Sequence, residues 1–280
     1  MKASLVQMLV HLDASPQVAQ RLTAARQIAQ AHGAAVTALY AVTPNFVELP
    51  FVPELGQNVA ADLREIDDEL RASARATYEQ SLTDSSVYMA WAEIRDDPVI
   101  SLFARQAFFA DLLVLGQHDP SGKPSSGVPA DFAESVLVAS GKPALILPYA
   151  GMLPAVIGET AVIAWKPTRE AALAVSAAMP LLQRARRVHV LAWRGEEMAV
   201  DSKLLSLDGY LKLHGVDAVW HSQGDEPPAL GELLLSRACD LDADLLVMGC
   251  YGHSRAREWI LGGTSRTVLR SMTLPVLMAH

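Results

Sequence analysis

The stretch ADLLVLG at residues 110–116 returns almost unchanged as ADLLVMG at residues 243–249. Three further pairs of similar segments follow the same order through the chain: 8–29 with 161–182, 89–98 with 218–227, and 135–148 with 267–280. Four matches in one order are hard to obtain by chance, and such self-similarity is the signature of repeated structural units. The sequence therefore predicts two copies of one domain, at residues 1–150 and 155–280, joined by a linker near residues 149–159.

Each copy consists of short apolar segments that alternate with helical patterns. SLVQMLVHL at residues 4–12 is one such apolar run, and Val18, Leu22, Ala25 and Ile28 follow it at the spacing of one helical face. Near-continuous apolar strands that alternate with helices are typical of a parallel sheet covered on both faces. We therefore predict an α/β protein with two tandem five-stranded parallel-sheet α/β sandwich domains of Rossmann-like type.

The first predicted helix has signals at both of its ends. Ser15 is expected to cap its amino terminus, with Pro16 at the first helical position. Gly33 is expected to end it.

The first copy also carries about 24 extra residues before its third strand, since the offset between matching residues falls from 153 to 129. This insertion includes TPNFVELPFVPELGQ at residues 43–57, which is rich in large apolar side chains and holds three prolines. Three prolines exclude a regular central strand. The part at residues 45–56 either covers the first domain or meets a partner chain, and we slightly favour a cover.

Composition limits the classes of function. The chain has 280 residues, of which 51% are hydrophobic, and a net charge of −8. This acidity argues against nucleic acid or an anionic membrane as a partner, because both require a basic surface. No run reaches the roughly 18 apolar residues of a membrane helix, and the amino terminus does not have a signal-peptide pattern, so we expect a cytoplasmic protein. Two cysteines and eight scattered histidines predict neither a disulfide framework nor a metal site.

A glycine-rich loop follows the repeated strand of the second copy. Gly249 ends that strand, Gly252 follows three positions later, and Gly262 comes after nine intervening residues. Glycines allow the backbone to approach a ligand closely, and the amino end of the next helix attracts an anion. The loop lacks the lysine of a P-loop and the glycine spacing of a dinucleotide-binding motif. A phosphate group would suit it, although glycine loops after strands are common for structural reasons alone.

This loop, together with the strand and helix order of both copies, resembles the adenine-nucleotide signature of the universal stress protein family. The resemblance extends over nearly the whole chain and identifies it as a tandem member. It implies a five-stranded parallel sheet in each copy, a cytoplasmic location, a role in the stress response, and pairing of domains through their last strands, with a homodimer also possible. It further implies that ATP, with or without Mg²⁺, binds on the glycine loop, near an Asp at the end of the first strand.

Each copy departs from that pattern at a different place. In the first copy, Asp13 and Gly116 match, but Asp119 replaces the second glycine and would repel phosphate. We therefore predict a degenerate first site around Asp13, Gly116 and Gly127. In the second copy, Lys166 stands at the Asp position. The resemblance places a nucleotide there on Lys166, Met248, Gly249, Gly252, His253, Arg255, Gly262, Gly263, Thr264 and Ser265.

Several residues have a simpler interpretation that stays open. Lys166 is typical of a solvated strand end, Trp165 of the core, and Cys250 of a small filler residue. No residue has the pattern of a catalytic nucleophile or base, so we predict a non-enzymatic protein, with weak ATP hydrolysis possible. The alternatives are a nucleotide-free interaction module of the same fold and, last, a nucleotide hydrolase or transferase.

Overall fold

The computed structural model describes residues 4–45, 57–82, 87–94, 97–121, 127–193, 205–225, 227–250 and 263–280. The chain divides into two compact units, Leu5–Lys142 and Pro143–His280, and the few residues before Leu5 group with the second. Each unit is described by itself.

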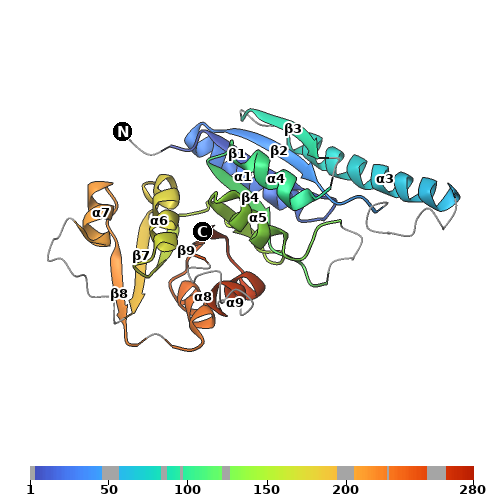
Figure 1. Ribbon diagram of the computed structural model, residues 1–280. Helices are drawn as coiled ribbons and strands as arrows, with labels where there is room; N and C mark the ends of the chain where they lie inside the picture. The colour runs from blue at the N-terminus through green and yellow to red at the C-terminus, as the bar shows by residue number, and fades with distance from the viewer. Residues whose placement is uncertain are drawn as a thin grey trace. The chain divides into compact units, whose positions relative to one another are not determined.

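The first unit is built on parallel strands in the order β3-β2-β1-β4 (Figure 1). Its helices connect successive strands, so each β-α-β crossover links two parallel strands. Helix α1 packs beside α3, and α4 packs beside α5. The elements are β1 (Gln7–Leu12), α1 (Val18–His32), β2 (Ala35–Ala41), α3 (Gln57–Ser81), β3 (Met89–Ile94), α4 (Val99–Ala107), β4 (Leu112–Gly116) and α5 (Phe132–Ser140).

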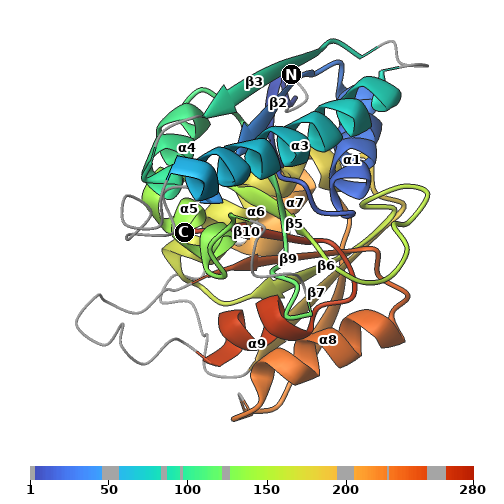
Figure 2. The same cartoon turned by 90° about the vertical axis from the view of Figure 1, so that its right-hand side faces the viewer.

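The second unit repeats this plan, with strands in the order β5-β10-β9-β6-β7-β8. All neighbours are parallel except β5 and β10, which run antiparallel with Leu145 opposite Leu277. Figure 2 shows α8 and α9 lying side by side. The elements are β5 (Ala144–Leu147), β6 (Thr160–Trp165), α6 (Arg169–Leu182), β7 (Arg187–Trp193), α7 (Leu207–Leu213), β8 (Val219–Gln223), α8 (Leu230–Asp240), β9 (Leu245–Gly249), α9 (Gly263–Ser271) and β10 (Val276–Ala279).

The α/β prediction is confirmed. The apolar runs predicted as strands form the centre of each core: all four residues of β5 and β10 are buried, as are the first four of β4 and β9. Helices cover both faces of such a sheet, which is why these strands are apolar throughout and do not alternate. The boundaries at residues 150 and 155 remain a prediction, and most of the 45–56 insertion lies outside the described residues.

The first helix ends as predicted but begins differently. Gly33 adopts a left-handed conformation with φ of 69°, and its N–H bonds to the carbonyl of Ala29. At the other end α1 starts at Val18, with Gln17 in the cap position and no side-chain cap. Ser15 does not cap this helix because its hydroxyl is engaged elsewhere: it donates to Asp13 over 2.6 Å. The predicted cap at Ser15 is therefore wrong.

In each unit the strand order reverses direction at one place. The chain moves outward from β1 to β2 and β3, then returns to place β4 on the other side of β1. The second unit does the same around β6, with β7 and β8 on one side and β9 on the other. Ligands of open α/β sheets bind at such a switch point, beyond the carboxyl ends of the two strands. The relevant pairs are thus β1 with β4 and β6 with β9.

Candidate functional site

The second unit brings two of the predicted site residues to its switch point. Lys166 directly follows β6, and Gly249 is the last residue of β9. Ala164 lies opposite Met248 in the ladder between these strands, so Lys166 and Gly249 emerge at the same edge. Lys166 is exposed, whereas Met248 is buried between β6 and β10. Lys166 therefore places an exposed cation at the carboxyl edge predicted for the site.

Gly249 is in close contact with the first turn of α6. A Cβ atom at this position would lie 2.6 Å from the carbonyl carbon of Glu170 and would also clash with the backbone nitrogen of Ala171. Thr168 caps this helix by accepting a hydrogen bond from that nitrogen at 3.3 Å. Packing alone therefore requires a glycine at position 249, because α6 could not approach the end of β9 this closely over a larger residue.

The predicted phosphate end of the site lies at the start of α9. Gly263 is exposed and has open space where a Cβ would be, Thr264 is half-buried, and Ser265 is buried. This first turn packs on α8, where a Cβ at Gly231 would lie 3.0 Å from the carbonyl oxygen of Thr264. The other predicted ligands lie outside the described residues: Gly252, His253, Arg255 and Gly262.

The first unit fills its switch point with an ion pair. The Arg21 guanidinium on α1 contacts the Asp13 carboxylate, which directly follows β1, with 2.5 Å between Nη2 and Oδ1. The two side chains are 5% and 7% exposed, so the pair is withdrawn from water. Ser15 adds two hydrogen bonds to the same carboxylate oxygen, from its backbone N–H at 2.8 Å and from its hydroxyl at 2.6 Å.

Arg21 also covers the end of β4. A Cβ built at Gly116 would lie 2.5 Å from Nη1 of Arg21, so the guanidinium reaches from the β1 side of the switch point to the β4 side. The Arg21 Nε atom is buried and has no hydrogen-bond partner among the described residues. In the second unit the repeat places Ala174 at this helix position, and its short side chain is buried. Among the described residues, the first unit thus carries a long side chain across its switch point, whereas the second unit has a short one at the matching position.

Burial and charge set the protonation of this cluster. Burial alone would raise the pKa of Asp13, but the Arg21 charge, with smaller contributions from His11 and Ser15, holds that pKa well below its usual range. Burial, assisted by the Arg21 charge, lowers the pKa of His11 to about 4. The neutral His11 ring donates from Nε2 to the Ala41 carbonyl at 2.8 Å and lies 4.2 Å from the Phe132 ring. The cluster is therefore an anion, a cation and a neutral imidazole at neutral pH.

The remaining predicted residues of the first site have structural contacts. Gly127 has φ of 61°, and its carbonyl accepts a hydrogen bond from the Thr43 N–H at 2.7 Å, just beyond β2. Asp119 accepts hydrogen bonds from the backbone N–H of Ser121 at 2.8 Å and from its hydroxyl at 2.7 Å. Gln17 at the start of α1 donates to Asp119 at 3.4 Å. A carboxylate thus lies beside the first turn of α1.

Arg21 is the residue of this switch point that the sequence interpretation missed. It occurs three residues after Val18 and one before Leu22, within the apolar face of the first helix. A charged residue on a buried face requires a partner, and Asp13 is the nearest acidic residue along the chain. That signal was present in the sequence.

The other features of the described residues give less support for a functional site. Cys250 is buried, and its thiol donates to the Ala279 carbonyl at 3.3 Å, as suits a filler residue. Within the described ranges, no group of three or more metal-ligating side chains comes together. None of the helices in those ranges combines the length and hydropathy of a membrane-spanning segment.

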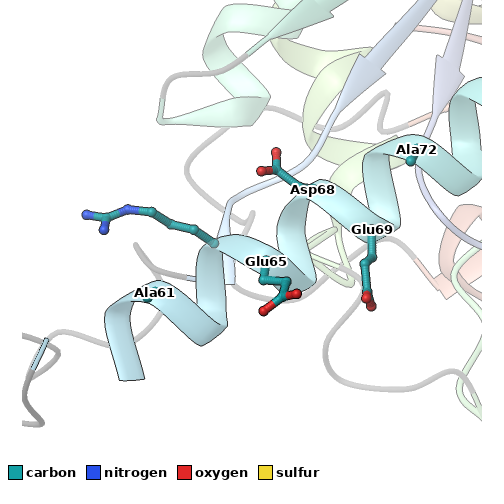
Figure 3. Close-up of a pocket in the computed structure, with 6 residues that line it drawn as sticks. Ala61, Glu65, Asp68, Glu69 and Ala72 are labelled. Carbon is teal, nitrogen blue, oxygen red and sulfur yellow. The ribbon is translucent and has the colours of Figure 1, made fainter. Parts of the chain in front are cut away.

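A shallow hollow lies on the exposed side of α3 (Figure 3). Three of the side chains that line it are carboxylates, and these would repel a phosphate group. The lining comes from a single helix: Ala61, Arg64, Glu65, Asp68, Glu69 and Ala72. It is no candidate for a nucleotide site.

Comparison with solved structures shows which known proteins share this fold. The chain resembles a universal stress protein from Archaeoglobus fulgidus DSM 4304 with a TM-score of 0.69 and 16% identity, over 97% of this chain and 94% of that one. For a putative universal stress protein from Pseudomonas aeruginosa UCBPP-PA14, the TM-score is 0.57 and the identity 17%, over 98% and 92%. At these identities the likeness shows the fold alone.

The sequence comparisons concern shorter segments. A 34-residue stretch is 53% identical to a universal stress protein of Synechocystis sp., and it spans 12% of this chain and 12% of that relative. Residues 168–280 match the model of the universal stress protein family. The second half is therefore a universal stress protein domain, which confirms the resemblance seen in its sequence. Both halves have the fold of solved universal stress proteins.

Proposed function

We propose that this protein is an adenine-nucleotide-binding member of the stress response, in which the second half holds ATP, with or without Mg²⁺, and the first half does not. The nucleotide would lie along the carboxyl edge of β6 and β9, on Lys166, Met248 and Gly249. Its phosphates would meet the first turn of α9, at Gly263, Thr264 and Ser265, and the loop residues Gly252, His253, Arg255 and Gly262.

The observation that carries this asymmetry is the Arg21 side chain. Its guanidinium occupies the space between Asp13 and Gly116, where the family resemblance places adenine and ribose. Oδ1 of Asp13 is engaged by Arg21 and Ser15, and the side chain is buried, so the carboxylate is poorly accessible to a ribose or an adenine edge. The second unit has Ala174 in place of Arg21 and an exposed Lys166 in place of Asp13. A cation at that edge suits an anionic ligand.

The protein would act by binding and not by catalysis, with slow ATP hydrolysis at most. We place it in the cytoplasm. The two repeats would pair through their last strands, and the antiparallel ladder between β5 and β10 supports this pairing.

The test is calorimetric titration of the full chain with ATP and Mg²⁺. Gly252→Asp places a carboxylate in the proposed phosphate loop, and the repulsion should weaken binding about tenfold to a hundredfold. Asp119→Asn is the matched control, since it changes charge in the first-half loop and should leave the affinity within about twofold. The proposal fails if Asp119→Asn alters binding while Gly252→Asp does not.

A nucleotide-free interaction module is the second candidate. It is favoured by the contact of Gly249 with α6, because this glycine is needed for packing whether or not a nucleotide binds. Absence of measurable ATP binding to the wild-type chain, with no nucleotide released on denaturation of the purified protein, would establish this second candidate.

A further inference from the structure

We propose that His189 and His221 form a binding site for a divalent transition metal ion on the second unit, away from the proposed nucleotide edge. His189 lies on β7 and His221 on the neighbouring strand β8. The Nδ1 atom of His189 and the Nε2 atom of His221 are 3.0 Å apart. In the register of these strands, His189 lies opposite Val219, two residues before His221. Both imidazoles therefore project from the same face of the sheet.

The distance between the two nitrogens suits a single metal ion. Imidazole nitrogens bind such ions at about 2.0–2.1 Å, so two nitrogens 3.0 Å apart subtend an angle of roughly 90–100° at the metal. This is the angle between neighbouring ligands in octahedral and tetragonal coordination, which Ni²⁺ and Cu²⁺ prefer. The ring planes are inclined by 46°, and modest side-chain rotation would aim both lone pairs at one point.

The two rings are partly open to solvent. Both histidines are half-buried. Burial, together with the charges of His221 and Arg187, lowers the pKa of His189. A ring N–H of one histidine donates a hydrogen bond to the ring nitrogen of the other, and a metal ion would replace that single hydrogen bond with two coordinate bonds. Arg187 opposes a second cation, which favours a weak and exchangeable site.

The fold itself does not require this pair. The third residue of β2 in the first unit corresponds to His189, and the residue after Trp91 on β3 corresponds to His221. Those positions hold Thr37 and Ala92, and β2 and β3 pair in the same register without imidazoles. The histidines are thus an addition made only in the second unit. Water would complete the coordination, because no third metal-ligating side chain joins them among the described residues.

The test is calorimetric titration of the untagged full chain with NiCl₂ at neutral pH. His189→Asn and His221→Asn should each remove one equivalent of bound Ni²⁺ per chain or weaken it at least tenfold. His214→Asn is the control, since His214 is a single imidazole that packs on Tyr210 in the same unit. Unchanged Ni²⁺ binding in both test variants, or an equal loss in His214→Asn, would overturn the proposal.

A variant that adds a ligand gives a second test. Its expected result is tighter binding, which destabilisation of the protein could not produce. Val219 is 55% exposed and lies beside both histidines on the same face of the sheet. Val219→His would add a third imidazole to the site and should strengthen Ni²⁺ binding at least tenfold. The same substitution in the His189→Asn background should not exceed the wild-type affinity. A Val219→His variant that binds Ni²⁺ no more tightly than the wild type contradicts the site.

Discussion

Arg21 and Asp13 form a buried ion pair across the switch point of the first unit, where a parallel α/β sheet would otherwise bind its ligand. Arg21 lies three residues after the start of α1, and Asp13 is the first residue after β1. The Arg21 side chain thus lies where a ligand would otherwise bind. This relationship is the basis of the proposal that the two repeats differ in nucleotide binding.

Removing the cation alone should be costly. Arg21→Met leaves the Asp13 carboxylate buried without its partner, and breaking such a pair costs about 3–5 kcal/mol. Urea denaturation at neutral pH should show this loss in the first unit. The double variant Arg21→Met with Asp13→Leu removes both charges and should recover most of the stability. A single variant as stable as the wild type would show that the pair contributes nothing.

Acid should destabilise the first unit through His11. Because the folded-state pKa of about 4 lies below the unfolded value of 6.5, the unfolded chain binds the proton more readily. The stabilisation is complete above pH 6.5 and is lost as the pH falls toward 4, by about 3 kcal/mol in all. His11→Gln keeps an N–H that can donate to the Ala41 carbonyl but does not titrate, so its stability should vary less over this range. Parallel pH profiles of the two proteins would contradict this assignment.

Two glycines of the proposed nucleotide site should respond differently to the same change. Gly249→Ala forces the first turn of α6 away from β9 and should destabilise the second unit by more than about 2 kcal/mol. Gly263→Ala meets open space at the start of α9 and should be neutral or stabilising by about 0.5–1 kcal/mol. Thermal unfolding of both variants measures this difference. Equal changes in stability in the two variants would contradict the close contact between α6 and Gly249.

The ladder between β5 and β10 should matter for solubility. Residues 155–280 expressed alone lack β5, so the edge of β10 loses its antiparallel partner. An unpaired apolar edge strand pairs with another chain. We expect this fragment to form a homodimer or to be insoluble, as judged by light scattering. A well-behaved monomer would count against the pairing of the repeats through their last strands.

The sequence predicted the fold because the features that determine it are local. Apolar strands such as ADLLVMG and the left-handed stop at Gly33 depend on near neighbours, and the internal repeat supplied a second copy of each signal. The start of α1 was misjudged because the Ser15 hydroxyl bonds to Asp13, a preference set by the ion pair and not by helix capping.

The site was harder to predict because its contacts are long-range. The family resemblance matched Asp13 to an adenine-contacting Asp, and the first site was predicted to be degenerate because of Asp119 alone. In the structure Arg21 also reaches Asp13 from the next helix. The role of Gly249 in packing depends on α6, which lies about 80 residues earlier in the chain. His189 and His221 are separated by 32 residues, so no ligand spacing reveals them until strand register brings them together.

The most direct test of the central claim is photo-crosslinking of the full chain with an azido-adenine analogue of ATP, followed by mass spectrometry of the labelled peptides. The account predicts labelling confined to peptides from residues 160–280, at one label per chain, which excess ATP suppresses and Gly252→Asp reduces. ATP-sensitive labelling of peptides around Asp13 or Gly116 would contradict it, because the Arg21 side chain would then not exclude the nucleotide from the first unit.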